Sequence, residues 1–101
     1  MTTRTRLIYF VIDPYTELRT AVGALLQSGE FTELLRATLP ILTPSARFAV
    51  ARGLSDIEAQ TDFDNLPIGA GPQFVMGEPR TLPVEIADPG RWVLDHLLRA
   101  A

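Results

Sequence analysis

The sequence predicts a single α+β domain in which a small, mainly antiparallel sheet packs against helices, with one layer of each. Short apolar runs rich in β-branched and aromatic residues alternate with segments whose apolar residues recur at helical spacing. These segments follow the order β-β-α-α-β-α, which is typical of an α+β fold. No internal repeat or linker divides the 101 residues, a length near the commonest size of one domain. Residues 1–101 are therefore expected to form one unit.

The first two strands are expected at residues 6–13 and 20–27. Residues 7–12 are all apolar, so the first strand should be covered on both faces and lie centrally in its sheet. Pro14 should end it, because proline cannot donate a hydrogen bond to the ladder. Gly23 in the second strand predicts a bulge or a close backbone approach. About seven polar-leaning residues separate the strands, so a wide loop is expected rather than a tight turn.

The next segment is expected to be helical between Ser28 and Pro40. Ser28 can cap a helix, acidic residues suit its first turn, and Pro40 would stop it. The apolar residues of this segment recur at helical spacing: Phe31, Leu34, Leu35 and Leu39. We therefore expect the first helix directly after the second strand.

A second helix is expected to start after Thr43, a capping residue, with Pro44 in the favoured first position. Gly53 is placed to end this helix. Ser55 and Glu58 then have the spacing of a capping box, which predicts a further short helix. Two arrangements remain open here: a chain kinked at Gly53, and one continuous helix.

The C-terminal part predicts a loop, short extended segments and a last helix. Residues 61–72 are rich in the turn-forming residues Asp, Asn, Gly and Pro. A third short strand is expected at residues 73–77, and the extended residues 78–86 can include an edge strand. Asp88 should cap the last helix, and Pro89 should open it. Four residues should share one face of that helix: Trp92, Val93, His96 and Leu97.

Composition argues against several classes of function. The chain carries 12 acidic residues and nine arginines without lysine, for a net charge of −3, so it lacks the basic stripe that nucleic-acid binding requires. Its longest apolar run is far shorter than the ~20 residues that cross a bilayer, and no signal peptide is expected. The absence of cysteine excludes disulfides, thiol catalysis and cysteine-bound zinc. We expect a small acidic bacterial protein of the cytoplasm, with no nucleic-acid or membrane partner.

No motif predicts catalysis, a metal site or a cofactor. His96 has no recognisable nucleophile to act on, so we interpret it as a partly exposed histidine near a helix C-terminus. Asp62 and Asp64 have the spacing of some metal ligands, but we interpret them as a polar turn with Phe63 in the core. Residues 69–72 do not read as a phosphate loop, because a strand follows them and the chain has no lysine.

We expect a non-catalytic protein-interaction module or subunit, with a protein partner or a homo-oligomer. Phe74, Met76 and Trp92 are the candidate interface residues, because aromatic and methionine side chains are enriched in interface cores. The alternative, that Phe74 and Trp92 fill the core of the chain itself, stays open. An edge strand near residues 74–82 offers a further means of pairing with a partner or a second copy.

The alternative function is a binder of a small polar ligand, or a minor enzyme, that uses the loop between the first two strands. The candidate binding residues are Asp13, Glu17, Arg19 and Arg80, since convergent charged residues over a sheet edge can hold a polar ligand. A structural interpretation competes with this one. In it, Asp13 binds a backbone donor of its own turn, and Glu17 and Arg19 form a solvated pair.

Two parts of the chain have a familiar spacing: Asp13, Pro14, Val22 and Gly23 near the N-terminus, and residues 74–98. They resemble an uncharacterised bacterial domain-of-unknown-function family that is often encoded beside HipA-type kinases. Residues 74–98 are similar to its closing strand, Asp-Pro pair and helix. Leu18 and Ala21 stand where the family carries Glu and Asn, so the resemblance implies that these polar groups are lost here. It also implies an α+β fold and a place in a multi-gene bacterial system.

Overall fold

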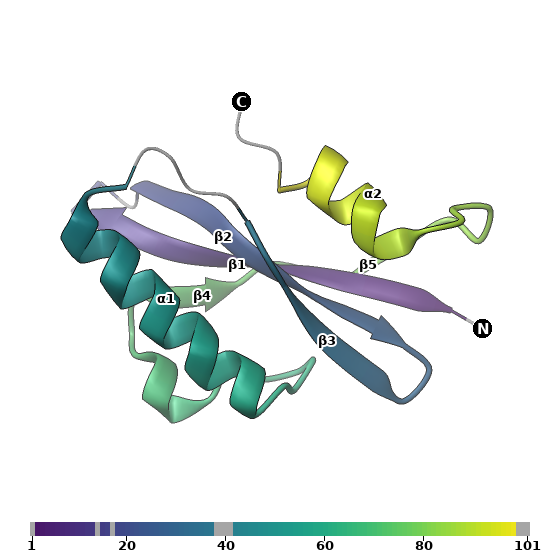
Figure 1. The fold of residues 1–101 in the computed structure, drawn as a ribbon, viewed down its shortest axis with the longest axis horizontal. Coiled ribbons are helices and arrows are strands. Elements are labelled where there is room, and N and C mark those ends of the chain that lie inside the picture. Colours follow the sequence, from purple (N-terminus) through teal and green to yellow (C-terminus); the bar gives the residue numbers. More distant parts are fainter. Residues whose placement is uncertain (1, 14, 17, 38–41, 99–101) are drawn as a thin grey trace.

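The computed structural model describes residues 2–13, 15–16, 18–37 and 42–98 of the chain. In these ranges it contains one sheet, two α-helices and a short 3-10 turn (Figure 1). The strands are β1 (Thr3–Asp13), β2 (Leu18–Ser28), β3 (Phe31–Arg36), β4 (Phe74–Met76) and β5 (Arg80–Thr81). The helices are α1 (Pro44–Ala59) and α2 (Pro89–His96), and the 3-10 turn η1 spans Ile68–Ala70.

The strands pair in the order β3-β2-β1-β4, and β5 also pairs with β1. Every pairing is antiparallel. β4 lies opposite residues 8–10 of β1, and β5 lies opposite Arg4 and Thr5. β1 is therefore central, as its continuous apolar run predicts, and the predicted α+β fold with an antiparallel sheet is confirmed.

Helices α1 and α2 cover opposite faces of the sheet. Successive side chains of a strand point to opposite faces, and those of β1 divide accordingly. Ile8 and Phe10 pack in the cluster that includes α1, whereas Leu7 and Tyr9 belong to the cluster that includes α2. The sheet thus lies between the two helices, in place of the single helical layer that the sequence suggested.

The segment after β2 is a strand, so the helix predicted over residues 28–40 is wrong. A two-residue turn that begins with Gly29 joins β2 to β3. Gly29 has a φ of 62°, a left-handed conformation that glycine adopts without steric cost. Leu34 and Leu35 lie opposite buried residues of β2, so pairing with β2 overrides the helical spacing. Positions 38–40 of the predicted helix, which include Leu39 and Pro40, lie outside the described ranges.

Helix α1 is continuous over its 16 residues, which decides between the two arrangements left open. Thr43 caps it as predicted, because its hydroxyl accepts a hydrogen bond from the amide of Ala46 at 3.2 Å. Gly53 does not end the helix but lies buried inside it, against the ring of Phe74. A Cβ atom at Gly53 would lie 2.3 Å from Cε2 of Phe74. Glycine therefore lets the helix pack closely on the sheet.

The connection between β1 and β2 is shorter than predicted. β1 ends at Asp13 and β2 begins at Leu18, which leaves positions 14–17 between them instead of about seven residues. Pro14 and Glu17 within this connection lie outside the described residues. The result is a long hairpin whose far end lies at the same end of the molecule as the start of α1 (Figure 1).

The pairing of β1 with β2 contains the irregularity that Gly23 predicts. Val22 is an extra residue of β2 between the partners of Ile8 and Tyr9. Such a bulge bends the strand and increases its twist. Gly23 also approaches β3, since a Cβ atom there would lie 2.7 Å from the carbonyl oxygen of Leu35. Both alternatives proposed for this glycine, a bulge and a close backbone approach, are therefore present.

The C-terminal half matches the prediction. β4 and α2 lie where a short strand and a last helix are expected, and β5 supplies the edge strand. The carboxylate of Asp88 caps α2 by accepting from the amide of Arg91 at 3.2 Å. Phe63 is buried, and Asp62 accepts from the amide of Asp64 at 2.9 Å. The Asp-Phe-Asp stretch is thus the expected polar turn with its aromatic ring in the core.

Candidate functional site

A hollow of about 300 Å³ lies beside β1, on the sheet face that carries α2. Leu7 and Tyr9 of β1 supply apolar surface. Arg19 of β2 and the segment that follows β4, with Glu78 and Arg80, supply charged groups. We call this cavity the arginine hollow, after Arg19 and Arg80. These parts of the sequence meet there because β2, β4 and β5 all pair with β1.

The strand register explains why both arginines reach the same hollow. Arg19 lies opposite Val11, and Arg80 lies opposite Thr5. Directly paired residues of antiparallel strands point to the same face, and so do alternate residues of one strand. Both arginines therefore rise from the face of β1 that carries the ring of Tyr9.

The guanidinium group of Arg19 stacks on the ring of Tyr9, with its central carbon 4.7 Å from the ring centroid. Stacking attracts the cation to the ring face and leaves the N–H groups along the guanidinium edges available. Within the described ranges, the ion pairs join Arg36 to Glu58 and Arg91 to Asp95. Neither arginine of the hollow is thus neutralised by a carboxylate from those ranges.

Gly77 holds the backbone of the hollow's rim against the same ring. Its amide donates to the carbonyl of Leu7 at 2.8 Å, and its carbonyl accepts from Nε of Arg6 at 2.9 Å. A Cβ atom at Gly77 would lie 3.0 Å from Cε2 of Tyr9. The absence of a side chain at Gly77 therefore leaves room for the ring of Tyr9 beside the rim.

A second hollow, of about 500 Å³, adjoins the first and shares Arg19 with it. Val11, Val75 and Thr16 are its other lining residues. Thr16 belongs to the connection between β1 and β2, so the two hollows run from the hairpin connection toward β5. Arg19 stands between them.

Of the four binding residues predicted from the sequence, the structure brings Arg19 and Arg80 together. Asp13 lines neither hollow, and its carboxylate accepts a hydrogen bond from the amide of Tyr15 at 2.9 Å. That contact is the structural role weighed against binding, because it forms part of the turn. Glu17 lies outside the described residues.

The three predicted interface residues have different positions. Phe74 is only 7% exposed and meets the ring of Phe10 edge to face, with centroids 5.3 Å apart. Its assignment to an interface is therefore corrected, because its ring fills the core under α1. Met76 is half-buried and lines the arginine hollow. Trp92 is half-buried on α2 and stacks on His96, with centroids 4.7 Å apart.

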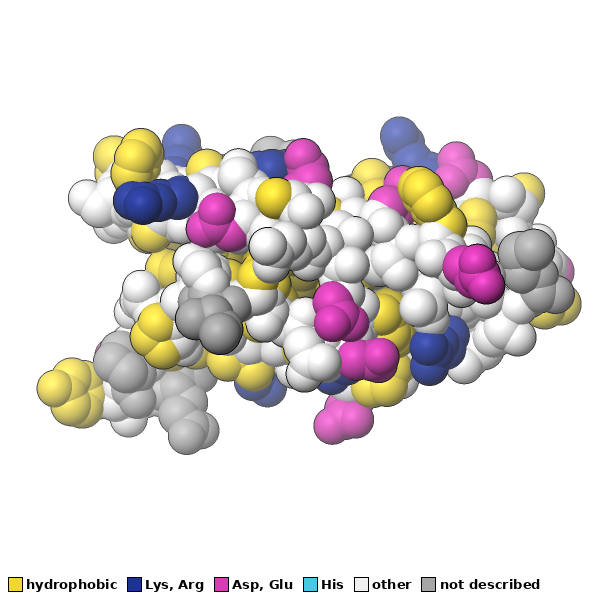
Figure 2. All heavy atoms as spheres, turned by 90° about the horizontal axis from the view of Figure 1, so that it is seen from below, with side chains coloured by type: hydrophobic (Ala, Val, Ile, Leu, Met, Phe, Trp, Pro, Cys, Tyr) yellow, Lys and Arg dark blue, Asp and Glu magenta, His cyan; other side chains and the backbone are white. Residues whose placement is uncertain are grey.

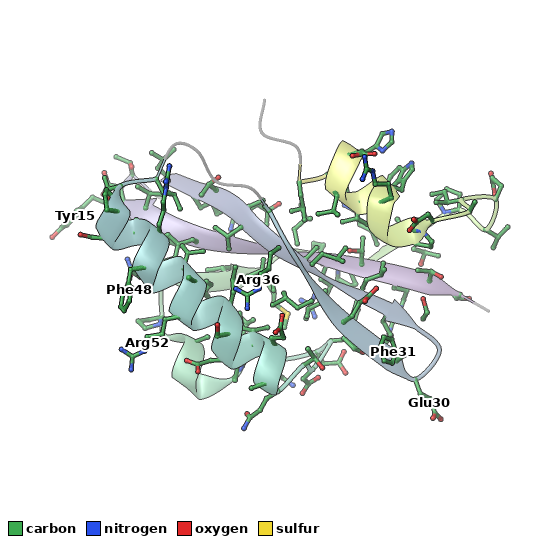
Figure 3. All side chains as sticks on the ribbon, in the orientation of Figure 1. Tyr15, Glu30, Phe31, Arg36, Phe48 and Arg52 are labelled. Carbon is green, nitrogen blue, oxygen red and sulfur yellow. The ribbon has the colours of Figure 1, made fainter. Side chains whose placement is uncertain are left out.

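Sequence reasoning missed an apolar surface at the end of the β1–β2 hairpin. It is formed by Ile12, Tyr15 and Leu18, and we call it the hairpin end. Their exposed fractions are 44%, 94% and 57%. Figure 3 shows Tyr15 pointing away from the body of the molecule, with Phe48 of α1 at the same end. In Figure 2 hydrophobic side chains protrude at that end, whereas acidic ones lie over the middle of the face. The sequence feature that could have predicted this surface is the presence of Tyr15 and Leu18 in the otherwise polar connection between the first two strands.

The described parts of the chain contain no cluster of three His, Asp or Glu side chains that could hold a metal ion. Nδ1 of His96 lies 2.9 Å from the carbonyl oxygen of Trp92, which accepts its hydrogen bond. His96 lines neither hollow. No helix in the described ranges is long and apolar enough to cross a membrane.

Comparison with known proteins gives no match: no protein family, curated protein or solved structure is similar to the chain at a significant level. Its class is defined by the fold alone, a small α+β domain with one antiparallel sheet between two helices. Two surface features distinguish this domain. One is the arginine hollow, and the other is the apolar hairpin end.

Proposed function

We propose that the chain is a small non-catalytic protein-interaction module, a subunit of a bacterial multi-protein system in the cytoplasm. The observation that carries this proposal is the exposure of the hairpin end, where Tyr15 is 94% exposed between Ile12 and Leu18. Clusters of exposed apolar side chains mark interaction surfaces more often than single ones do. The partner is a protein or a second copy of the chain. A net charge of −3 argues against a nucleic acid.

Tyr15 has the properties of an anchor residue. Tyrosine is enriched among the few interface residues that dominate binding energy, and burying a large apolar side chain contributes about 1.5–3 kcal/mol. The hydrogen bond from its amide to Asp13 holds the local backbone in a turn. A surface that is already ordered loses less conformational entropy when it binds. The turn therefore favours binding through Tyr15.

The place of the module in a multi-protein system is proposed from the resemblance, seen in the sequence alone, to the family encoded beside HipA-type kinases. That family's loop carries polar residues where this chain has Leu18 and Ala21. Leu18 is 57% exposed, so the replacement adds apolar area to the hairpin end. A change from a polar to an apolar surface fits a contact with a protein better than a site for a polar ligand in the loop.

The proposal is tested by affinity purification of the tagged chain from its source cells. We expect a stoichiometric protein partner, or a dimer by light scattering, that is lost in the Tyr15→Ser/Leu18→Ser variant. Val84→Ser is the matched control, because Val84 is 87% exposed in the loop before α2, remote from the hairpin end. Retention of the partner by the double variant, or equal loss in the control, would contradict the proposal, as would a monomer without a partner.

A second candidate function is the binding of a small polar ligand. The specific observation in its favour is that Arg19 and Arg80, chosen from the sequence as ligand contacts, line one hollow. Both side chains are exposed and lack an ion-pair partner within the described ranges. Replacing either arginine should therefore leave the melting temperature nearly unchanged while ligand binding is lost, since surface substitutions usually alter stability by under ~0.5 kcal/mol.

A further inference from the structure

We infer that the arginine hollow binds a small dicarboxylate: a short carbon chain with a carboxylate at each end. The inference rests on the second candidate function and names its class of ligand. It is independent of the hairpin end, whose role is tested with variants of Tyr15 and Leu18. The argument starts from the positions of the two guanidinium groups.

The two arginines enter the hollow from opposite ends. Arg80 pairs with Thr5 and Arg19 pairs with Val11, six residues further along β1. Six residues of a strand span about 20 Å. Because both side chains nevertheless line one cavity of about 300 Å³, they must extend toward each other along the strand. A ligand that uses both guanidinium groups therefore needs an anionic group at each end.

Each arginine is suited to a carboxylate in particular. A guanidinium offers parallel N–H donors that match the two oxygens of a carboxylate, which gives a bidentate contact. In Arg19 the ring of Tyr9 covers one face of the group, so its donors lie along the open edges. Gly77 lies close beside that ring. Arg19 is therefore positioned before any ligand arrives, which reduces the entropic cost of binding.

The middle of the hollow is suited to hydrocarbon. Leu7 and Tyr9 of β1 supply its apolar lining, whereas the side chain of Met76 packs with the cluster under α1. A carbon chain placed against Leu7 and Tyr9 removes apolar surface from water, which contributes roughly 25 cal/mol per Å². A polar or strongly hydrated linker would lose that contribution. The volume lies at the lower end of the range for small-molecule sites, ~300–1,000 Å³, so a short chain fits better than a large ring system.

Glu78 sets an upper limit on the charge of the ligand. It lines the same hollow as the two arginines, so the three ionised side chains carry one net positive charge. A third carboxylate on the ligand would meet Glu78 with a like charge and without a further arginine. Like charges in proximity are destabilising at such a site. Tricarboxylates should therefore bind more weakly than dicarboxylates of the same length.

Isothermal titration calorimetry with the full chain tests this inference. The probes are succinate, glutarate, adipate and pimelate, with hexanoate and adipamide as controls that lack one or both charges, and citrate as the tricarboxylate. We expect at least one dicarboxylate to saturate one site, at least tenfold tighter than all three controls. Arg19→Gln and Arg80→Gln should each weaken that binding at least tenfold, with thermal unfolding unchanged.

Arg52→Gln is the matched control variant, because it removes the same charge from an exposed position on α1 (Figure 3). It should bind the dicarboxylate as the original chain does. The inference is overturned if none of the four dicarboxylates binds with a Kd below 10 mM, which corresponds to a binding free energy of about −2.7 kcal/mol. It is also overturned if hexanoate binds as tightly, or if Arg52→Gln weakens binding as much as the two hollow variants. The affinity purification with hairpin-end variants is unaffected by either result.

Discussion

Gly53 shows how one residue determines the distance between a helix and a sheet. Alanine favours a helix interior over glycine by about 0.5–1 kcal/mol, so propensity alone would favour Gly53→Ala. In this fold, a Cβ atom at that position would lie 2.3 and 2.4 Å from ring atoms of Phe74. The ring is itself packed against Phe10 and has little room to move. Overpacking should therefore outweigh helix propensity.

We predict that Gly53→Ala lowers the free energy of unfolding by at least about 1 kcal/mol, within the ~1–3 kcal/mol typical of overpacked cores. Urea denaturation monitored by circular dichroism measures it. In a Phe74→Leu background the same change should be neutral or stabilising, because the ring atoms that it would meet are absent. A Gly53→Ala variant more stable than the original chain would contradict the packing of α1 on β4.

Arg19 and Arg80 also show what sequence alone could not determine about the site. They are far apart in the sequence and belong to different strands, and each pairs with β1. Their meeting depends on the register of two strand pairs, including the bulge at Val22. The sequence indicated that charged residues surround the first hairpin. It left two roles open for Asp13, in its own turn or in ligand binding, and it grouped Arg80 with Arg19 without the strand register that brings both to one hollow.

Among the elements, β3 shows that a local apolar pattern can fit a helix and a strand equally well. Its apolar residues fit helical spacing as well as a half-buried edge strand, because Leu34 and Leu35 point to opposite faces of the sheet, toward separate clusters. The two-residue turn at Gly29 decides the outcome by returning the chain alongside β2. By contrast, β1 and α2 were predictable. β1 has a long apolar run of β-branched and aromatic residues, and α2 has a capping Asp followed by Pro.

We predict that Gly29→Ala destabilises the fold by about 1–3 kcal/mol, the usual cost of a left-handed residue other than glycine. Gly29→Asn should cost less, because asparagine tolerates this conformation better. Chemical denaturation of the three proteins gives the comparison. The sign of the change in stability distinguishes the β2–β3 hairpin from the helix that the sequence predicted for this segment. In a helix, Gly29→Ala would stabilise the chain, and that result would contradict the β2–β3 hairpin.

At the scale of the whole molecule, the two helices leave different parts of the sheet available. α1 and α2 cover opposite faces. The β1–β2 hairpin ends near the start of α1 (Figure 1), and its end carries exposed apolar side chains. The acidic side chains over the middle of one face keep that region hydrated (Figure 2). The arrangement favours contact through one end of the molecule rather than through a broad face.

The central claim, that the hairpin end contacts a protein partner, is tested most directly by site-specific photocrosslinking in the source cells. The photoreactive residue benzoylphenylalanine is placed at Tyr15 in one variant and at Val84, exposed in the loop before α2, in another. We predict that light joins the Tyr15 variant to one protein species, or to a second copy of the chain, and that the Val84 variant gives no such product. Equal products from both positions, or none from position 15, would contradict the claim.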